Sequence, residues 1–162
     1  MSSLVTALFP SRATAERAID ELSSAGFTQD DISMLMSDTT RGREFGVKEA
    51  TKVPEGAATG ATVGGVIGAV VASLAAVGTL AIPGLGLVAA GPVLAGLAGL
   101  GAGAAAGGLT GALVGVGIPE HEAKFYDDKI RKGGILLGVY AHDDRKKDAK
   151  HILEAAGAER VH

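Results

Sequence analysis

Apolar and polar positions in the first 37 residues follow two different periodicities, which predict a strand, a helix and a second strand. Residues 4–9 are an apolar run that reads as a strand. Ser11 can cap a helix over roughly 12–25, which ends before a glycine. The apolar positions of this helix recur at helical spacing: Ala15, Ala18, Ile19 and Leu22. Residues 32–37 predict the second strand, parallel to the first after a right-handed crossover.

The last third of the chain predicts a helix, a strand and a helix. Pro119 begins the first helix, since its missing N–H costs nothing at that position. Acidic residues follow in the first turn and basic residues in the last, as the helix dipole favours. Residues 135–141 are a β-rich apolar run. Either Asp143 or Asp144 caps a final helix over about 145–156.

Together with a short edge strand over residues 158–161, the outer blocks follow the order of a split β-α-β fold. We therefore predict an α+β, ferredoxin-like domain interrupted by a Gly/Ala-rich helical hairpin. Residues 1–55 form its first half, residues 56–118 the hairpin insertion, and residues 119–162 its second half.

Glycine recurs at every fourth position in two runs of the uncharged middle block. Gly91 and Ala95 extend the second run backwards in step. A glycine at this spacing leaves a groove without side chains along one helix face, which is the packing rule of membrane helices. We predict that these helix-packing glycines form a zipper: Gly56, Gly60, Gly64, Gly68, Gly99, Gly103, Gly107, Gly111 and Gly115.

The middle block predicts two helical arms around a turn. The arms cover about 54–79 and 93–117, and residues 79–92, with two prolines and three glycines, make the turn. Crossing a bilayer takes roughly 20 helical residues, so both arms are long enough. Because the outer halves must meet in one sheet, both termini lie on the same side. The expected location is the inner membrane with both termini in the cytoplasm, and the alternative is cytoplasmic.

Composition narrows the chemistry. A net charge of −3 gives no sign of the basic stripe that nucleic-acid binders show. The chain has no cysteine, and its first residues carry no signal-peptide pattern. The glycine clusters lack a phosphate-loop pattern, and the histidines and paired aspartates have local explanations as surface, turn and cap residues. We expect no enzyme, no catalytic residue, no metal and no cofactor.

The sheet offers a second apolar face. A ferredoxin-like sheet carries helices on one face and usually leaves the other polar. Here the alternate positions of the first and third strands are largely apolar, and we predict that they mediate self-association: Leu4, Leu8, Leu136 and Tyr140. This face would be buried against a second copy of the chain or against the hairpin.

Two segments flanking the glycine-rich block resemble a known family. They read VTALFPSRATAERAIDELSSAGFTQDDISML and GIPEHEAKFYDDKIRKGGILLGVYAHDD. This layout resembles the bacterial general-stress, or low-temperature-induced, protein family. The resemblance implies a ferredoxin-like domain with a Gly/Ala-rich hairpin, stress-linked expression and membrane association. It implies no catalytic residues.

Three functions remain open from the sequence. The first is a non-enzymatic stress protein that inserts its hairpin into membrane lipid and self-associates as a homo-oligomer. The alternative is a soluble scaffold whose hairpins pack into a large homo-oligomer. The third is a small-molecule sensor whose ligand the sequence does not identify.

Overall fold

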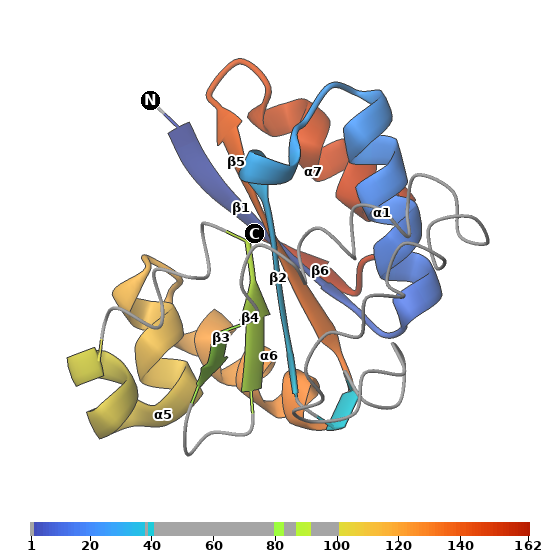
Figure 1. The fold of residues 1–162 in the computed structure, drawn as a ribbon. Coiled ribbons are helices and arrows are strands. Elements are labelled where there is room, and N and C mark those ends of the chain that lie inside the picture. The colour runs from blue at the N-terminus through green and yellow to red at the C-terminus, as the bar shows by residue number, and fades with distance from the viewer. Residues whose placement is uncertain (1, 38, 41–79, 83–86, 92–100) are drawn as a thin grey trace, which may run out of the picture.

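A single antiparallel sheet runs through the middle of the molecule, with helices on both sides (Figure 1). The computed structural model describes residues 2–37, 39–40, 80–82, 87–91 and 101–162. Within these ranges the sheet has six strands in the order β3-β4-β2-β5-β1-β6.

The first block has the predicted elements. Strand β1 (Ser2–Phe9) leads into helix α1 (Arg12–Ser24), and a short 3₁₀ turn, η1 (Gln29–Asp31), precedes strand β2 (Ile32–Ser37). The Ser11 hydroxyl accepts a hydrogen bond from the Thr14 N–H at 3.4 Å, which confirms the predicted N-cap.

The last block also has its predicted order. It contains helix α6 (Glu120–Arg131), strand β5 (Ile135–His142), helix α7 (Lys146–Ala155) and strand β6 (Arg160–Val161). The predicted aspartate cap of α7 is wrong. Arg145 occupies the N-cap without a side-chain hydrogen bond, and Asp143 instead accepts a hydrogen bond from Ser3 Oγ at 3.1 Å.

Strand β5 lies between β1 and β2 and pairs with both in antiparallel register. Strands β1 and β2 therefore run parallel without touching, which is the defining feature of a split β-α-β unit. Strand β6 pairs with β1 on its other side, opposite Ala7 and Leu8. The fold class is α+β, as predicted, and the order β2-β5-β1-β6 agrees with the ferredoxin-like arrangement.

The described part of the expected turn over 79–92 is a β-hairpin, which corrects the sequence interpretation. Strand β3 (Leu80–Ile82) pairs with β4 (Leu87–Ala90), and β4 pairs with β2. Gly91 follows β4 with φ +92°, so it does not extend a helical glycine stripe. A Cβ at this position would lie 2.5 Å from the Ile32 carbonyl oxygen, which explains why glycine is required there.

One face of the sheet packs against α1 and α7 (Figure 1). Helix α1 buries the four apolar side chains that its spacing predicts, Ala15, Ala18, Ile19 and Leu22. Helix α7 adds Ala149 and Leu153. Strand β1 adds the side chains at alternate positions that face this side, including Val5 and Phe9.

The opposite face is covered by α6 and by α5 (Gly101–Gly115), so the prediction of helices on one face only is wrong. Leu109 and Leu113 of α5 and Tyr126 and Ile130 of α6 pack with sheet residues such as Leu136. The described end of the glycine-rich block therefore shares one core with the outer blocks.

Helix α5 is the described part of the expected second arm. It has 15 residues and is interrupted at Gly108, whose φ of 60° and ψ of −148° are not helical. The expected first arm over 54–79 lies outside the described residues.

Candidate functional site

The four predicted self-association residues divide into two pairs. Leu8 and Leu136 are fully buried beneath α5 and α6, so the fold itself covers them. Helix α5 belongs to the block predicted as the hairpin, whereas α6 belongs to the second outer block. Leu4 and Tyr140 lie directly opposite each other on β1 and β5. Leu4 is half-buried and Tyr140 is 43% exposed.

The glycine stripe can be located only on α5. Within the described residues, Gly107 and Gly115 are exposed and Gly111 is half-buried. A Cβ built at Gly107 has no described atom within 4 Å, so no described backbone packs closely there. Gly103 lies in the same helix, but its surroundings are not described. The remaining zipper positions lie outside the described residues: Gly56, Gly60, Gly64, Gly68 and Gly99.

The predicted inner-membrane location is wrong. In the part of the chain that the structure describes, no helix combines the length and the apolar character that crossing a bilayer requires. The interruption at Gly108 and the packing of Leu109 and Leu113 on the sheet account for this at α5.

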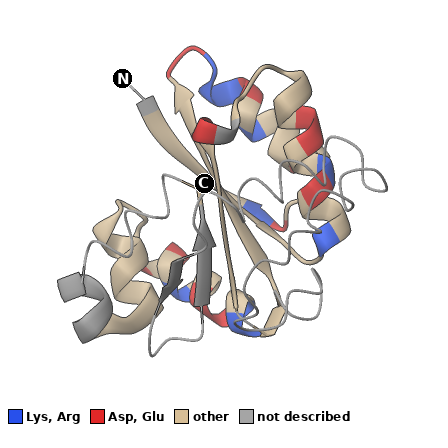
Figure 2. Ribbon diagram, viewed as in Figure 1, with Lys and Arg blue, Asp and Glu red and all other residues tan. Residues whose placement is uncertain are grey.

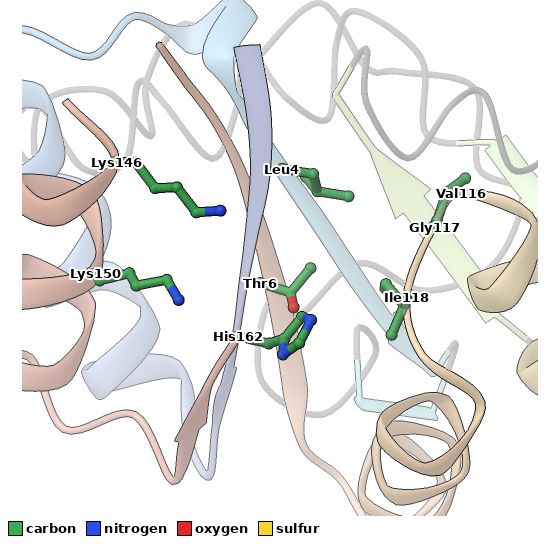
Figure 3. A pocket seen from close by; sticks show the side chains of 8 residues that line it. All are labelled: Leu4, Thr6, Val116, Gly117, Ile118, Lys146, Lys150 and His162. Carbon is green, nitrogen blue, oxygen red and sulfur yellow. The ribbon is translucent and has the colours of Figure 1, made fainter. Parts of the chain in front are cut away.

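A cavity of about 280 Å³ opens along β1, beside His162, which pairs with Thr6 (Figure 3). We call it the edge notch. Its described lining residues are Leu4, Thr6, Val116, Gly117, Ile118, Lys146, Lys150 and His162. The two lysines reach toward β1 from α7, on one face of the sheet, while Val116 and Ile118 come from the α5–α6 connection on the other (Figure 3).

A buried polar pair supports one wall of the notch. The Tyr126 hydroxyl lies 3.2 Å from Thr6 Oγ1, and either oxygen can donate the hydrogen bond. Burial raises the pKa of the Tyr126 phenol, and the nearby Glu122 carboxylate raises it further, against the lowering effects of Thr6 and Arg160. Tyr126 therefore stays neutral and joins α6 to β1.

A second set of contacts holds β6 against α6. Arg160 of β6 lies 3.4 Å from both oxygens of the largely buried Glu122 carboxylate. The same guanidinium stacks over the Phe125 ring, 4.2 Å from its centroid. Lys129 pairs with Glu159 at 3.2 Å. These contacts fix the short strand whose end borders the notch.

The described residues offer no obvious metal centre, since no three His, Asp or Glu side chains gather among them in a way that could hold an ion. The chemistry of the notch is instead that of two ammonium groups, a threonine hydroxyl, the His162 side chain and an apolar wall. This combination suits binding of an anionic, partly apolar group.

A family model for the heat induced stress protein YflT domain matches residues 5–99, more than half of the 162 residues. The chain belongs to the YflT heat-induced stress protein family. This confirms the resemblance to bacterial general-stress proteins. No curated protein and no solved structure matches the chain.

The YflT match includes most of β1, all of α1, β2, β3 and β4, and ends before α5. The sheet is completed by β5 and β6, which lie after the match. The edge notch therefore combines Thr6 from the YflT region with Lys146 and Lys150 from beyond it.

Sequence reasoning missed the two lysines of the notch, because basic residues on a predicted helix are usually a solvated face. One signal was available. Lys146 and Lys147 stand in the first turn of α7, where the helix dipole disfavours cations. Such a conflict between local preference and sequence is characteristic of functional positions.

Proposed function

We propose that this YflT-family chain is a non-enzymatic stress-response protein that acts by self-association, with the outer face of α5 as the contact surface. Membership of a heat-induced stress family supports the stress-related role. The arrangement of α5 supports the association. Of the three functions that the sequence leaves open, this proposal corresponds to the self-assembling scaffold.

The observation that carries the proposal is the division of α5 into two faces. Leu109, Ala112 and Leu113 are buried toward the sheet. At 100° per residue, Gly111 and Val114 fall on the opposite side of the helix. Val114 is 42% exposed. Among the described residues, Val114 and Tyr140 are the exposed large hydrophobic residues.

The outer face of α5 also lacks charge. Helices α1, α6 and α7 carry acidic and basic residues, whereas no Asp, Glu, Lys or Arg occurs in Gly101–Gly115 (Figure 2). Each glycine within a helix costs up to about 1 kcal/mol relative to alanine. Close approach of a second helix along this face would offset that cost through van der Waals contact and burial of Val114.

Leu4 and Tyr140 supply a second apolar surface. They stand directly opposite each other in the register of β1 and β5, so both lie on the same face of the sheet. Because Leu8 and Leu136 are already buried, this pair is what remains accessible of the predicted sheet interface. It extends the proposed contact surface beyond α5.

Light scattering on purified chain tests the proposal through Val114→Asp. A charge at the centre of the contact surface should lower the particle mass toward the 16.1 kDa of one chain. Ala13→Asp is the matched control, because it adds the same charge at an exposed position of α1, on the other side of the sheet. Equal particle masses for the two variants and the unmodified chain would refute the proposed surface.

A further inference from the structure

Helix α5 lacks the interactions that stabilise a helix from within. Six of its 15 residues are glycine, which lowers helix stability more than any residue except proline. Ion pairs between successive turns stabilise the other helices, such as Arg12 with Glu16 in α1. Helix α6 has such a pair in Glu120 and Lys124. Since α5 has no charged residue, its helical state depends on contacts with the rest of the chain.

The described contacts that hold α5 in place come from one side of the helix. Leu109, Ala112 and Leu113 are buried against α6 and the sheet. Thr110 Oγ1 donates a hydrogen bond to the Asp127 carboxylate of α6 at 3.0 Å. Figure 1 shows α5 at the periphery of the molecule, beside α6. An element with few buried contacts and low intrinsic stability opens more readily than the core around it.

Two glycines bound the buried half of α5 and give it pivots. Gly108 interrupts the helix with φ 60° and ψ −148°, and Gly117 follows it with φ +95°. A Cβ built at either position has no described atom within 4 Å, so no described atom restricts the chain closely there. Glycine changes its backbone angles at little steric cost, which makes both positions suited to a hinge.

The core that α5 and α6 form with the sheet contains large apolar side chains. Leu8, Tyr126 and Leu136 are fully buried in it. Leu8 and Leu136 lie on the same sheet face as Leu4 and Tyr140, as the register of β1 and β5 shows. Departure of α5 would therefore open a core that continues a partly exposed apolar face.

We propose that residues 109–115 form a lid, which undocks from α6 and the sheet while the rest of the described domain stays folded. Gly108 and Gly117 are its pivots. The closed lid buries Leu109 and Leu113, and the open lid exposes them together with the core beneath. This motion concerns the inner face of α5 within one chain, so it does not depend on self-association through the outer face.

Amide hydrogen exchange of the unmodified chain, followed by NMR in low concentrations of urea, tests the lid. So short a helical segment does not stay helical once undocked, so its amides lose their hydrogen bonds. The reporters are the N–H groups of Val116 and Ile118, which donate to the Leu113 carbonyl at 3.2 and 3.1 Å. We expect them to exchange at least about tenfold faster than the amides of residues 124–130 in α6, with a weaker dependence on urea. Equal rates and equal urea dependence would overturn the lid, since α5 would then open only when the whole domain unfolds.

Thiol labelling separates undocking from fraying of the backbone. Ala112→Cys places a thiol under the lid, and Ala18→Cys is the matched control, because Ala18 is a fully buried alanine of α1 on the other sheet face. With N-ethylmaleimide, the Ala112→Cys chain should react at least about tenfold faster. Adding Thr110→Val, which removes the bond to Asp127, should accelerate it at least about threefold further.

Two labelling results would contradict the lid. If the Ala112→Cys chain reacts no faster than the Ala18→Cys chain, rapid amide exchange reflects fraying beneath docked leucines. If Thr110→Val leaves the rate unchanged, labelling does not proceed through loss of the contact between α5 and α6. The exchange measurement uses no variant, so a misfolded cysteine variant would not leave the question open.

Discussion

Gly91→Ala tests whether the β3–β4 hairpin is built into the sheet. An alanine Cβ at this position would lie 2.5 Å from the Ile32 carbonyl oxygen and 2.8 Å from Ser33 Cα, both main-chain atoms of β2. Such atoms cannot move aside without disturbing the ladder, and overpacking of this kind costs about 1–3 kcal/mol. The backbone at φ +92° adds about 1–2 kcal/mol for a residue with a Cβ.

The two contributions together predict a loss of about 2–5 kcal/mol in the free energy of unfolding, a large share of the roughly 5–15 kcal/mol typical of a domain. In urea this lowers the unfolding midpoint by on the order of 1–2 M. The measurement is a urea titration followed by circular dichroism, with the slope of the transition compared among variants.

Substitutions at two other glycines separate the cost of overpacking from the cost of the backbone conformation. Gly117 has φ +95° but no described atom within 4 Å of a built Cβ, so Gly117→Ala should show only the backbone cost of about 1–2 kcal/mol. Gly107→Ala, in a helix and facing open space, should be neutral or stabilising by up to about 1 kcal/mol. If Gly91→Ala unfolds at the same midpoint as Gly117→Ala, the close packing of β4 on β2 is refuted.

Three further substitutions probe the packing of α5 and α6 on the sheet. Leu113→Ala should destabilise the chain by about 2–5 kcal/mol, measured by urea unfolding, because Leu113 is fully buried between α5 and the sheet. Tyr126→Phe should cost about 1 kcal/mol near neutral pH through the lost bond to Thr6. Since burial raises the Tyr126 pKa, its stabilising effect is present below pH 10 and is lost as the pH rises through the raised value; the gap between this variant and the unmodified chain should therefore narrow at alkaline pH. Leu8→Glu should unfold the chain, as seen by circular dichroism, rather than merely dissociate an assembly, because Leu8 is buried.

The outer blocks could be predicted from sequence because their local signals agree with the packing. The spacing of Ala15, Ala18, Ile19 and Leu22 identified the buried face of α1. The alternation in β1 and β5 identified both faces of those strands, and Gly26 and Gly133 marked the ends of helices. Here periodicity and turn chemistry point to the same structure.

The middle block was harder, because glycine and alanine carry little information about which neighbour they touch. The run Leu80–Ile82 is too short to distinguish a strand from part of an apolar turn. The register that pairs Met36 with Val88 is a long-range contact that no local pattern specifies. The absence of charge around α5 indicated a bilayer, whereas the described helix buries its leucines on the sheet.

The edge notch could not be predicted for a different reason. Its lining comes from the first strand, the α5–α6 connection and the last helix, which only the folded sheet brings together. The sequence could identify Leu4 and Tyr140 as apolar positions on one face. It could not show that His162 would exchange backbone hydrogen bonds with Thr6 and line the same notch as Leu4.

Site-specific cross-linking tests the proposed self-association most directly. The chain has no cysteine, so Val114→Cys and Ala13→Cys each introduce a single reactive thiol, on α5 and on α1 respectively. With a short bismaleimide, the Val114→Cys chain should give a covalent dimer of about twice 16.1 kDa at concentrations where the Ala13→Cys chain stays a monomer. Cross-linking of the Val114→Cys chain that does not exceed that of the Ala13→Cys chain would contradict association through the outer face of α5.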